Sequence, residues 1–127
     1  PTPDRANLVI YTPIDNEKVV IRPLMSEREA RELLDSLSEI GVIEVPLEKK
    51  RRDIYRELVA TAEPKVYVSI IKTVAHRREE FKRTRRRLPD IDNDAEHIAK
   101  TGLYGELAAV LGLSREEIHN MITEKTL

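Results

Sequence analysis

The sequence of 127 residues has no cysteine and no tryptophan, one phenylalanine and four scattered glycines. Without cysteine the chain can form neither a disulfide framework nor a thiolate metal site. The scattered glycines provide no glycine-rich loop that would cradle a phosphate or a dinucleotide. No apolar run approaches the roughly 18 residues of a membrane-spanning helix, so no membrane partner is expected. These absences predict a cytoplasmic protein with an apolar core, for which 40% hydrophobic residues are sufficient.

Residues that usually carry catalysis or bind metals are few and poorly spaced. The three histidines do not stand at the spacing of metal ligands, and no serine has the context of a catalytic triad. Residues 90–94 are similar to the start of a calcium loop, but Ala95 stands where the loop needs glycine and Thr101 where it needs glutamate. We therefore expect no enzyme, no metal and no cofactor.

Charge is what the chain has in excess, at 35% of residues against roughly 25% in an average soluble domain. The formal net charge is −1, but it is unevenly distributed. Residues 1–47 carry five basic and nine acidic side chains (net −4), residues 48–87 fourteen and six (net +8), and residues 88–127 three and eight (net −5). A nearly neutral protein therefore has a strongly basic middle third.

Two segments of this middle third are the most basic: Lys49-Lys50-Arg51-Arg52 and Lys82-Arg83-Thr84-Arg85-Arg86-Arg87. Such segments are typical of surfaces that bind nucleic-acid phosphates. They also occur on solvated helix faces whose charge is balanced by acidic neighbours. Composition leaves both interpretations open.

The first part of the chain has the pattern of two short strands. Residues 7–12 and 19–22 are rich in β-branched and aromatic types, and Pro13 and Pro23 end them. Two strands do not form a stable sheet alone. We therefore expect residues 1–25 to be the last strands of an incomplete β domain, a remnant hairpin whose unpaired edge could drive a strand-swapped dimer.

The remainder, residues 26–127, is predicted to be a separate helical domain, so the fold class is mainly α. Ser26 and Glu29 form a capping box for a helix that Gly41 would end. A second helix, 48–62, places Ile54, Leu58 and Ala62 on one stripe.

Pro64 suits the first turn of a long third helix, 65–87. Its predicted buried stripe is Val66, Ile70, Val74, Phe81 and Leu88, and its opposite face is Lys65, Ser69, Lys72, His76 and Arg83.

Two further helices complete a compact bundle of about five. Asp92 or Asp94 would cap a helix over 94–111, which Gly112 would end. A second capping box at Ser114 opens a short last helix.

The position of the basic segments on consecutive helices suggests one shared surface. If the helices on either side of Pro64 pack antiparallel, residues 49–52 meet residues 82–87. Aromatic residues are scarce there, since Phe81 falls on the predicted buried stripe. The expected mode is phosphate contact and reading of DNA shape, with little base readout.

The end of the chain also has the spacing of a helix-turn-helix motif. Ala108, Gly112 and Ile118 stand at the offsets of the small, turn and buried positions. A recognition helix from Ser114 to about Lys125 would be net negative, which disfavours entry into a groove lined with phosphates. A helix-turn-helix repressor using residues 107–122 stays an alternative, and an ordinary helical hairpin explains the spacing as well.

Several segments together resemble a known family. They are Tyr11-Thr12-Pro13-Ile14-Asp15-Asn16, Ile21-Arg22-Pro23-Leu24, Arg51-Arg52, Ile70-Ile71-Lys72 and Leu103-Tyr104-Gly105-Glu106-Leu107-Ala108. In this order they resemble the CarD-like bacterial transcription regulators over nearly the whole chain. The resemblance implies an SH3-like or Tudor-like β domain that binds the RNA polymerase β subunit. It also implies a helical domain that binds promoter DNA at the upstream edge of the melted region and alters open-complex stability.

The resemblance also assigns positions and a location. Tyr11 falls near the family's polymerase-binding strand, and Ala75 stands where many members carry a tryptophan that wedges into the minor groove. Without that wedge, the protein would depend on phosphate contacts, and it would be nucleoid-associated in the cytoplasm. The residues predicted to contact DNA are Lys49, Lys50, Arg51, Arg52, Lys72, His76, Arg77, Lys82, Arg83 and Arg86. The rival hypothesis is a protein-interaction scaffold whose basic face binds an acidic protein.

Overall fold

Five α-helices make up most of the structure, a computed structural model that describes residues 8–11 and 20–126. The helices are α1 (Glu27–Asp35), α2 (Arg51–Ala60), α3 (Pro64–Arg83), α4 (Asp90–Leu111) and α5 (Arg115–Thr126). Two short 3-10 turns, η2 (Leu37–Glu39) and η3 (Glu48–Lys50), lie between α1 and α2. The predicted mainly helical fold of about five helices is thus confirmed. In the part of the chain that the structure describes, no helix is long and apolar enough to cross a bilayer.

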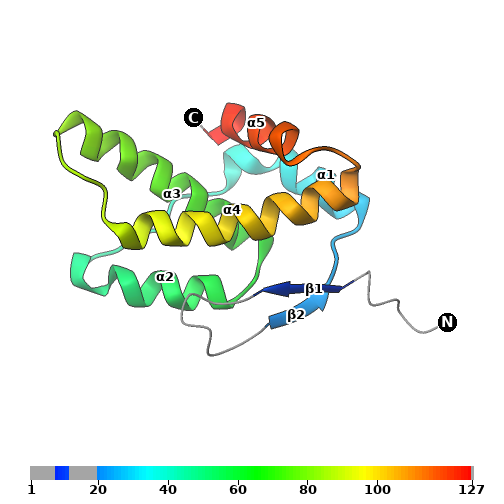
Figure 1. Cartoon of the computed structure of the whole chain (residues 1–127), viewed down its shortest axis with the longest axis horizontal. Coiled ribbons are helices and arrows are strands. Elements are labelled where there is room, and N and C mark those ends of the chain that lie inside the picture. Colours follow the sequence, from blue (N-terminus) through cyan, green and yellow to red (C-terminus); the bar gives the residue numbers. More distant parts are fainter. Residues whose placement is uncertain (1–7, 12–19, 127) are drawn as a thin grey trace.

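The core is organised around α4, which runs along the length of the bundle (Figure 1). It packs against α1, α2, α3 and α5. Ala95, Ala99, Leu103 and Leu107 on its inner face are fully buried, and the same helix also buries the carboxylates of Asp92 and Glu106. The largest fully buried side chains elsewhere in the core are Leu37, Tyr55, Val59, Tyr67, Val68, Ile70, Val74, Ile118 and Ile122.

Two short strands precede the helices. β1 (Leu8–Tyr11) pairs antiparallel with β2 (Val20–Pro23), with Leu8 opposite Pro23 and Tyr11 opposite Val20. Pro13 and the predicted turn lie outside the described residues. That this pair ends a larger SH3-like or Tudor-like domain, and that its edge drives a swapped dimer, stay predictions.

The predicted capping boxes and the predicted roles of Pro64 and Gly112 at helix ends are confirmed. Ser26 Oγ accepts from the Glu29 amide at 3.0 Å, and the Glu29 carboxylate accepts from the Ser26 amide at 3.0 Å. Ser114 and Glu117 form the same reciprocal pair at the start of α5. Pro64 is in the first turn of α3, and Gly112 ends α4 with a left-handed φ of 67°.

Several helix boundaries differ from the predicted ones, including both ends of α2, which was predicted over 48–62. α1 ends at Asp35 instead of Gly41, because the Ser36 hydroxyl donates to the Leu33 carbonyl at 3.0 Å and the chain tightens into η2. α3 ends at Arg83, four residues early, in a left-handed turn. α4 begins at Asp90, so Asp92 lies inside the helix and is not a cap.

The buried faces of α2 and α3 also differ from the predicted stripes. On α2 the fully buried residues are Tyr55 and Val59, while Ile54 and Leu58 are half-buried, so the stripe is rotated by one position. On α3 Lys72 is buried, although it was expected on the opposite face. Its ammonium donates to the Ile40 carbonyl, because the segment after η2 covers this side of α3.

Candidate nucleic-acid interface

The two basic segments lie at the same end of the bundle. Figure 1 shows the start of α2 and the end of α3 at the left of the molecule, with the start of α4 between them. An ion pair of 2.7 Å between Arg77 on α3 and Glu48 on η3 joins the two elements directly. The antiparallel arrangement on which the shared basic surface depended is therefore present.

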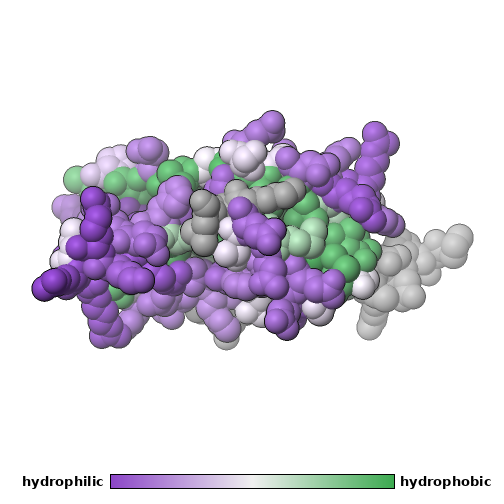
Figure 2. Space-filling view, turned by 90° about the horizontal axis from the view of Figure 1, so that it is seen from above, coloured by the Kyte–Doolittle hydropathy of each residue, from purple (hydrophilic) through white to green (hydrophobic). Residues whose placement is uncertain are grey.

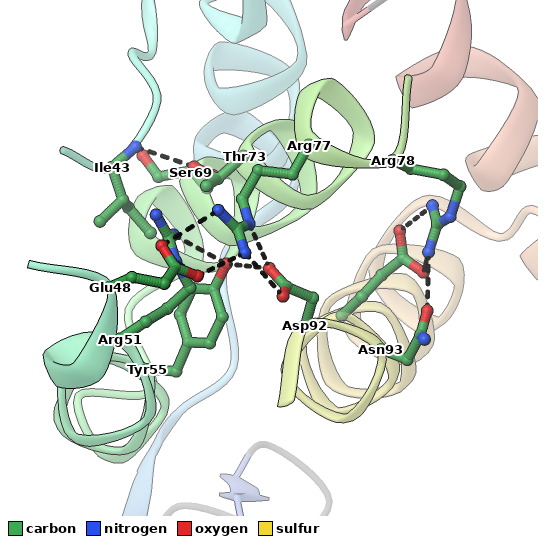
Figure 3. Close-up of polar contacts among 11 residues, drawn as sticks. Ile43, Glu48, Arg51, Tyr55, Ser69, Thr73, Arg77, Arg78, Asp92 and Asn93 are labelled. Carbon is green, nitrogen blue, oxygen red and sulfur yellow. Dashed lines mark hydrogen bonds and ion pairs between the residues drawn. The ribbon is translucent and has the colours of Figure 1, made fainter. Parts of the chain in front are cut away.

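A polar network lies beneath this end, buried on the side of Asp92 and Tyr55 and exposed at Glu48 (Figure 3). The carboxylate of Asp92 has no exposed surface. It accepts from the Tyr55 hydroxyl at 2.7 Å and from Arg77 Nε and Nη2 at 2.7 and 3.1 Å. Arg77 Nη2 also donates to Glu48 at 2.7 Å. Arg51 completes the network, since Nε donates to Glu48 at 3.0 Å and Nη1 to the Tyr55 hydroxyl at 3.3 Å.

The network joins two guanidinium groups, two carboxylates and one hydroxyl group. Burial raises the pKa of Tyr55 to about 12, and the hydrogen bond to Asp92 acts in the same direction. Burial acts to lower the pKa of Arg77, but the hydrogen bonds and negative charges of Asp92 and Glu48 raise it overall. The five side chains of the network therefore link η3, α2, α3 and α4.

Three of the ten residues predicted to contact DNA belong to the interior. Arg51 is 6% exposed, Lys72 is 8% exposed and the Arg77 side chain is 16% exposed. Each is held by partners within the fold, so none is free to bind a phosphate. The sequence could not show this, because a basic residue in a basic run has the same pattern whether it is paired or not.

The other seven predicted residues are partly or fully at the surface, and most lie at this end. Lys49, Lys50 and Arg52 surround the start of α2, and Lys82, Arg83 and Arg86 surround the end of α3. His76 is exposed one to two turns earlier on α3 and lines a surface depression with Lys82 and Arg83.

Two exposed arginines of the same basic segment, Arg85 and Arg87, were not among the residues predicted to contact DNA. We call the whole surface the basic end. It consists of Lys49, Lys50, Arg52, Lys82, Arg83, Arg85, Arg86 and Arg87. Figure 2, seen from above, shows hydrophilic side chains projecting from this end of the molecule.

Most charges of the basic end have no acidic partner. Among the described residues, no carboxylate lies within ion-pair distance of Lys49, Lys50, Arg52, Lys82, Arg85 or Arg86. Arg83 pairs with Glu80 and Arg87 with Asp90, but these pairs are more than half exposed and contribute little stability. The positive charge of this surface is therefore available to an external anion.

The end of α3 has an unusual backbone. The Arg86 amide donates to the Phe81 carbonyl at 2.7 Å and the Arg85 amide to the Lys82 carbonyl at 3.1 Å. These two bonds form a Schellman motif, in which Arg85 takes the left-handed position with a φ of 57°. Glycine is the usual residue there, because a Cβ is strained in this conformation.

Ala75, the predicted wedge position, lies beside a hollow of about 180 Å³ between α3, α4 and α5. Arg78, Glu96 and Tyr104 line it, and Arg78 donates to Glu96 at 2.7 Å. Burial acts to raise the pKa of Glu96, but the hydrogen bond from Arg78 and the charge of Lys100 lower it overall. Burial and the negative charge of Glu96 raise the pKa of Tyr104 to about 12. The alanine presents no side chain large enough to wedge between bases.

The residues of the candidate helix-turn-helix form an ordinary helical hairpin between α4 and α5. Ile118 is fully buried, Ala108 is half-buried and Gly112 forms the left-handed turn between α4 and α5. The exposed side chains of α5 include Glu116, Glu117 and Glu124. This hairpin therefore presents an acidic surface, which disfavours contact with DNA.

Tyr11 is the last residue of β1. Within the described residues, no group of three or more potential ligands could hold a metal ion.

Comparison with known proteins identifies no relative: neither a scan against protein-family models nor a search of curated proteins finds a match for this chain. Its function must therefore be inferred from its own residues and their geometry.

Proposed function

We propose that this protein is a non-enzymatic transcription regulator that holds promoter DNA at the basic end of its helical bundle and RNA polymerase through the β1–β2 part. The observation that carries the DNA-binding part is a set of six cations at one end of the bundle, in η3, in α2, in α3 and in the turn after α3, none of which has an acidic partner among the described residues. Phosphate contacts of this kind dominate the affinity of proteins for DNA. The expected contacts go to the backbone of the duplex and carry little direct sequence information.

The distribution of charge supports a defined orientation on DNA. The acidic α5 and the basic end belong to different parts of the bundle, and the net charge of the chain is only −1. A polyanion therefore attracts one end of the molecule and repels the acidic surface of α5. This polarity presents the basic end to DNA.

The polymerase part of the proposal depends on the resemblance to CarD-like regulators. In that family the strands before the helical domain bind the polymerase β subunit, and Tyr11 would be part of this contact. The order of the elements, strands followed by a helical bundle, is compatible with it. A Tyr11→Ala variant should lose binding to RNA polymerase in a pull-down and keep the DNA affinity of the wild-type protein.

The DNA-binding part is tested by fluorescence anisotropy with duplex and forked DNA at two salt concentrations. We expect affinity to fall steeply with salt, and the triple variant Lys49→Glu, Arg52→Glu, Lys82→Glu to lose at least tenfold in affinity. The matched control is Arg28→Glu, Arg31→Glu, Lys65→Glu. It changes the net charge equally at exposed positions, and Lys65 is about 25 Å along α3 from Lys82 at 1.5 Å per residue.

The outcomes separate the proposal from its rivals. Equal losses in both triple variants would contradict an interface at the basic end. Binding to polymerase without any salt-dependent binding to DNA would instead support the protein-interaction scaffold. A helix-turn-helix repressor would show strong sequence preference and would lose it after substitutions on α5.

A further inference from the structure

Phe81, the only phenylalanine of the chain, lies at the basic end and is not fully buried. It packs against the edge of the core and keeps part of its side chain at the surface. Two guanidinium groups contact its ring: the Arg86 Cζ atom is 4.3 Å from the ring centroid and the Arg77 Cζ atom is 5.1 Å from it. An aromatic ring therefore lies among the cationic side chains of the basic end.

The two arginines are held very differently. Arg77 is anchored by Asp92 and Glu48, as described above. Arg86 is exposed, and within the described residues its side chain has no acidic partner and donates only to the Thr84 hydroxyl, at 3.0 Å. Arg86 can therefore leave the ring without breaking an ion pair, while Arg77 stays in place.

From this geometry we propose that Phe81 is a stacking platform for an unpaired nucleobase of forked or single-stranded DNA, and that Arg86 covers the platform in the free protein. A planar guanidinium on an aromatic ring occupies the position that a planar base takes when it stacks. A phosphate beside the base attracts Arg86, and the base replaces it on the ring. Combining aromatic stacking with cations that follow the backbone is the general mode of single-strand binding.

The backbone of the turn supports this role. Arg85 occupies a left-handed position that glycine would adopt without strain. In most Schellman motifs, the two residues at the positions of Phe81 and Arg86 make an apolar contact. Here the Arg86 guanidinium lies on the Phe81 ring instead. Residues held in a strained backbone conformation are enriched at functional sites.

This inference rests on the proposed DNA binding and adds a preference to it. The protein should bind forked or single-stranded DNA more tightly than duplex, because only unpaired bases can stack on Phe81. Phosphate contacts alone would show no such preference.

The single phenylalanine makes a direct test feasible in the intact chain. ¹⁹F-labelled phenylalanine gives one NMR signal, which reports on Phe81 alone. We expect this signal to shift on addition of a single-stranded or forked oligonucleotide, through the ring current of the stacked base, and to move much less with a blunt duplex. Equal shifts with both DNAs, or no shift at saturation, would overturn the stacking role.

A variant series measures the same preference as affinity. Phe81→Leu should bind single-stranded DNA about tenfold more weakly and leave duplex affinity unchanged, whereas Phe81→Tyr should retain both. Val66→Ala controls for general destabilisation, because Val66 is also half-buried on α3 but far from the basic end. Unchanged single-strand affinity in a folded Phe81→Leu protein would contradict the inference.

The two proposals can fail separately. If the triple charge variant loses DNA binding but the Phe81 signal never responds, the basic end is an interface and only the stacking role is wrong. If the wild-type protein binds neither form of DNA at low salt, both proposals are wrong.

Discussion

The fully buried carboxylate of Asp92 lies 2.7 Å from Nε of Arg77, and this pair connects the first turn of α4 to the middle of α3. Tyr55 on α2 donates to the same carboxylate. The arrangement of the three helices at the basic end therefore depends on one acidic side chain. A surface built from separate elements keeps its shape only if those elements are fixed relative to each other, so this pair supports the interface without being part of it.

Loss of the Asp92 charge should strongly destabilise the fold. Asp92→Asn would leave the partly buried Arg77 with the more exposed Glu48 as its acidic partner, so we expect the variant to lower the free energy of unfolding by about 3 kcal/mol. Urea denaturation monitored by circular dichroism measures this change. The control is Asp94→Asn, an exposed position on the same helix, which should change the stability by less than about 0.5 kcal/mol. Similar stability of the two variants would show that the network is not structural.

Alkaline pH should unfold the protein in a predictable window. Tyr104 has a pKa raised from 10.0 to about 12, so its hydroxyl stays protonated in the folded state after it ionises in the unfolded chain. The resulting stabilisation is complete below pH 10 and is lost as the pH rises from about 10 to 12. It amounts to about 3 kcal/mol for this shift.

Urea denaturation at pH 9.5 and pH 11.5 tests this sign with Tyr104→Phe. The variant should lose less stability between the two pH values than the wild-type protein, because phenylalanine does not ionise. The Tyr55 hydroxyl, which shares the pKa of about 12, remains in both proteins and contributes equally. An equal loss of stability between the two pH values in both proteins would contradict a raised pKa of Tyr104 as the cause of the alkaline destabilisation.

The comparison between sequence and structure shows which features are local. The capping boxes at Ser26 and Ser114 were predicted correctly because all their partners lie within three residues. Asp92 was expected to cap a helix, because only its neighbours in the sequence could be considered. Its partners in the structure, Tyr55 and Arg77, are 37 and 15 residues away. No spacing rule connects them before the fold is known.

The basic segments also show that contacts between residues distant in the sequence could not be predicted at the candidate site. The sequence located the basic segments, but it could not separate Arg51, which is held by Glu48 and Tyr55, from its exposed neighbour Arg52. Phe81 was expected to be buried because its helical position matched the apolar stripe. The early end of α3 leaves it at the edge of the core, and the turn that follows carries Arg86 onto its ring.

A tryptophan at position 75 should convert the protein into a stronger binder of forked DNA. The resemblance to CarD-like regulators places a wedge there, and insertion between bases requires a large apolar side chain. We expect Ala75→Trp to raise affinity for forked DNA about tenfold over duplex. Because the natural chain has no tryptophan, quenching of the new fluorescence on DNA binding reports insertion directly. Ala109→Trp, at an exposed position of α4, is the control, and equal quenching in both would contradict a wedge position.

Arg85→Gly should have opposite effects on stability and on DNA binding. Glycine relieves the left-handed strain at the end of α3, so the free energy of unfolding should rise by about 0.5–1 kcal/mol. The same change removes one cation of the basic end, so DNA affinity should fall. The slope of log K against log salt concentration should become smaller by about 1, the value for one phosphate contact.

Arg85→Gln separates the two effects, because it removes the charge and keeps the Cβ that causes the strain. We expect this variant to lose as much DNA affinity as Arg85→Gly, with no gain in stability. Urea denaturation and anisotropy titrations over a range of salt concentrations measure both quantities on the same proteins. A glycine variant that is more stable and binds DNA as tightly as the wild-type protein would show that the strained arginine serves no role in binding. A loss of affinity in both variants would instead show that the fold tolerates strain at position 85 because the interface needs its charge.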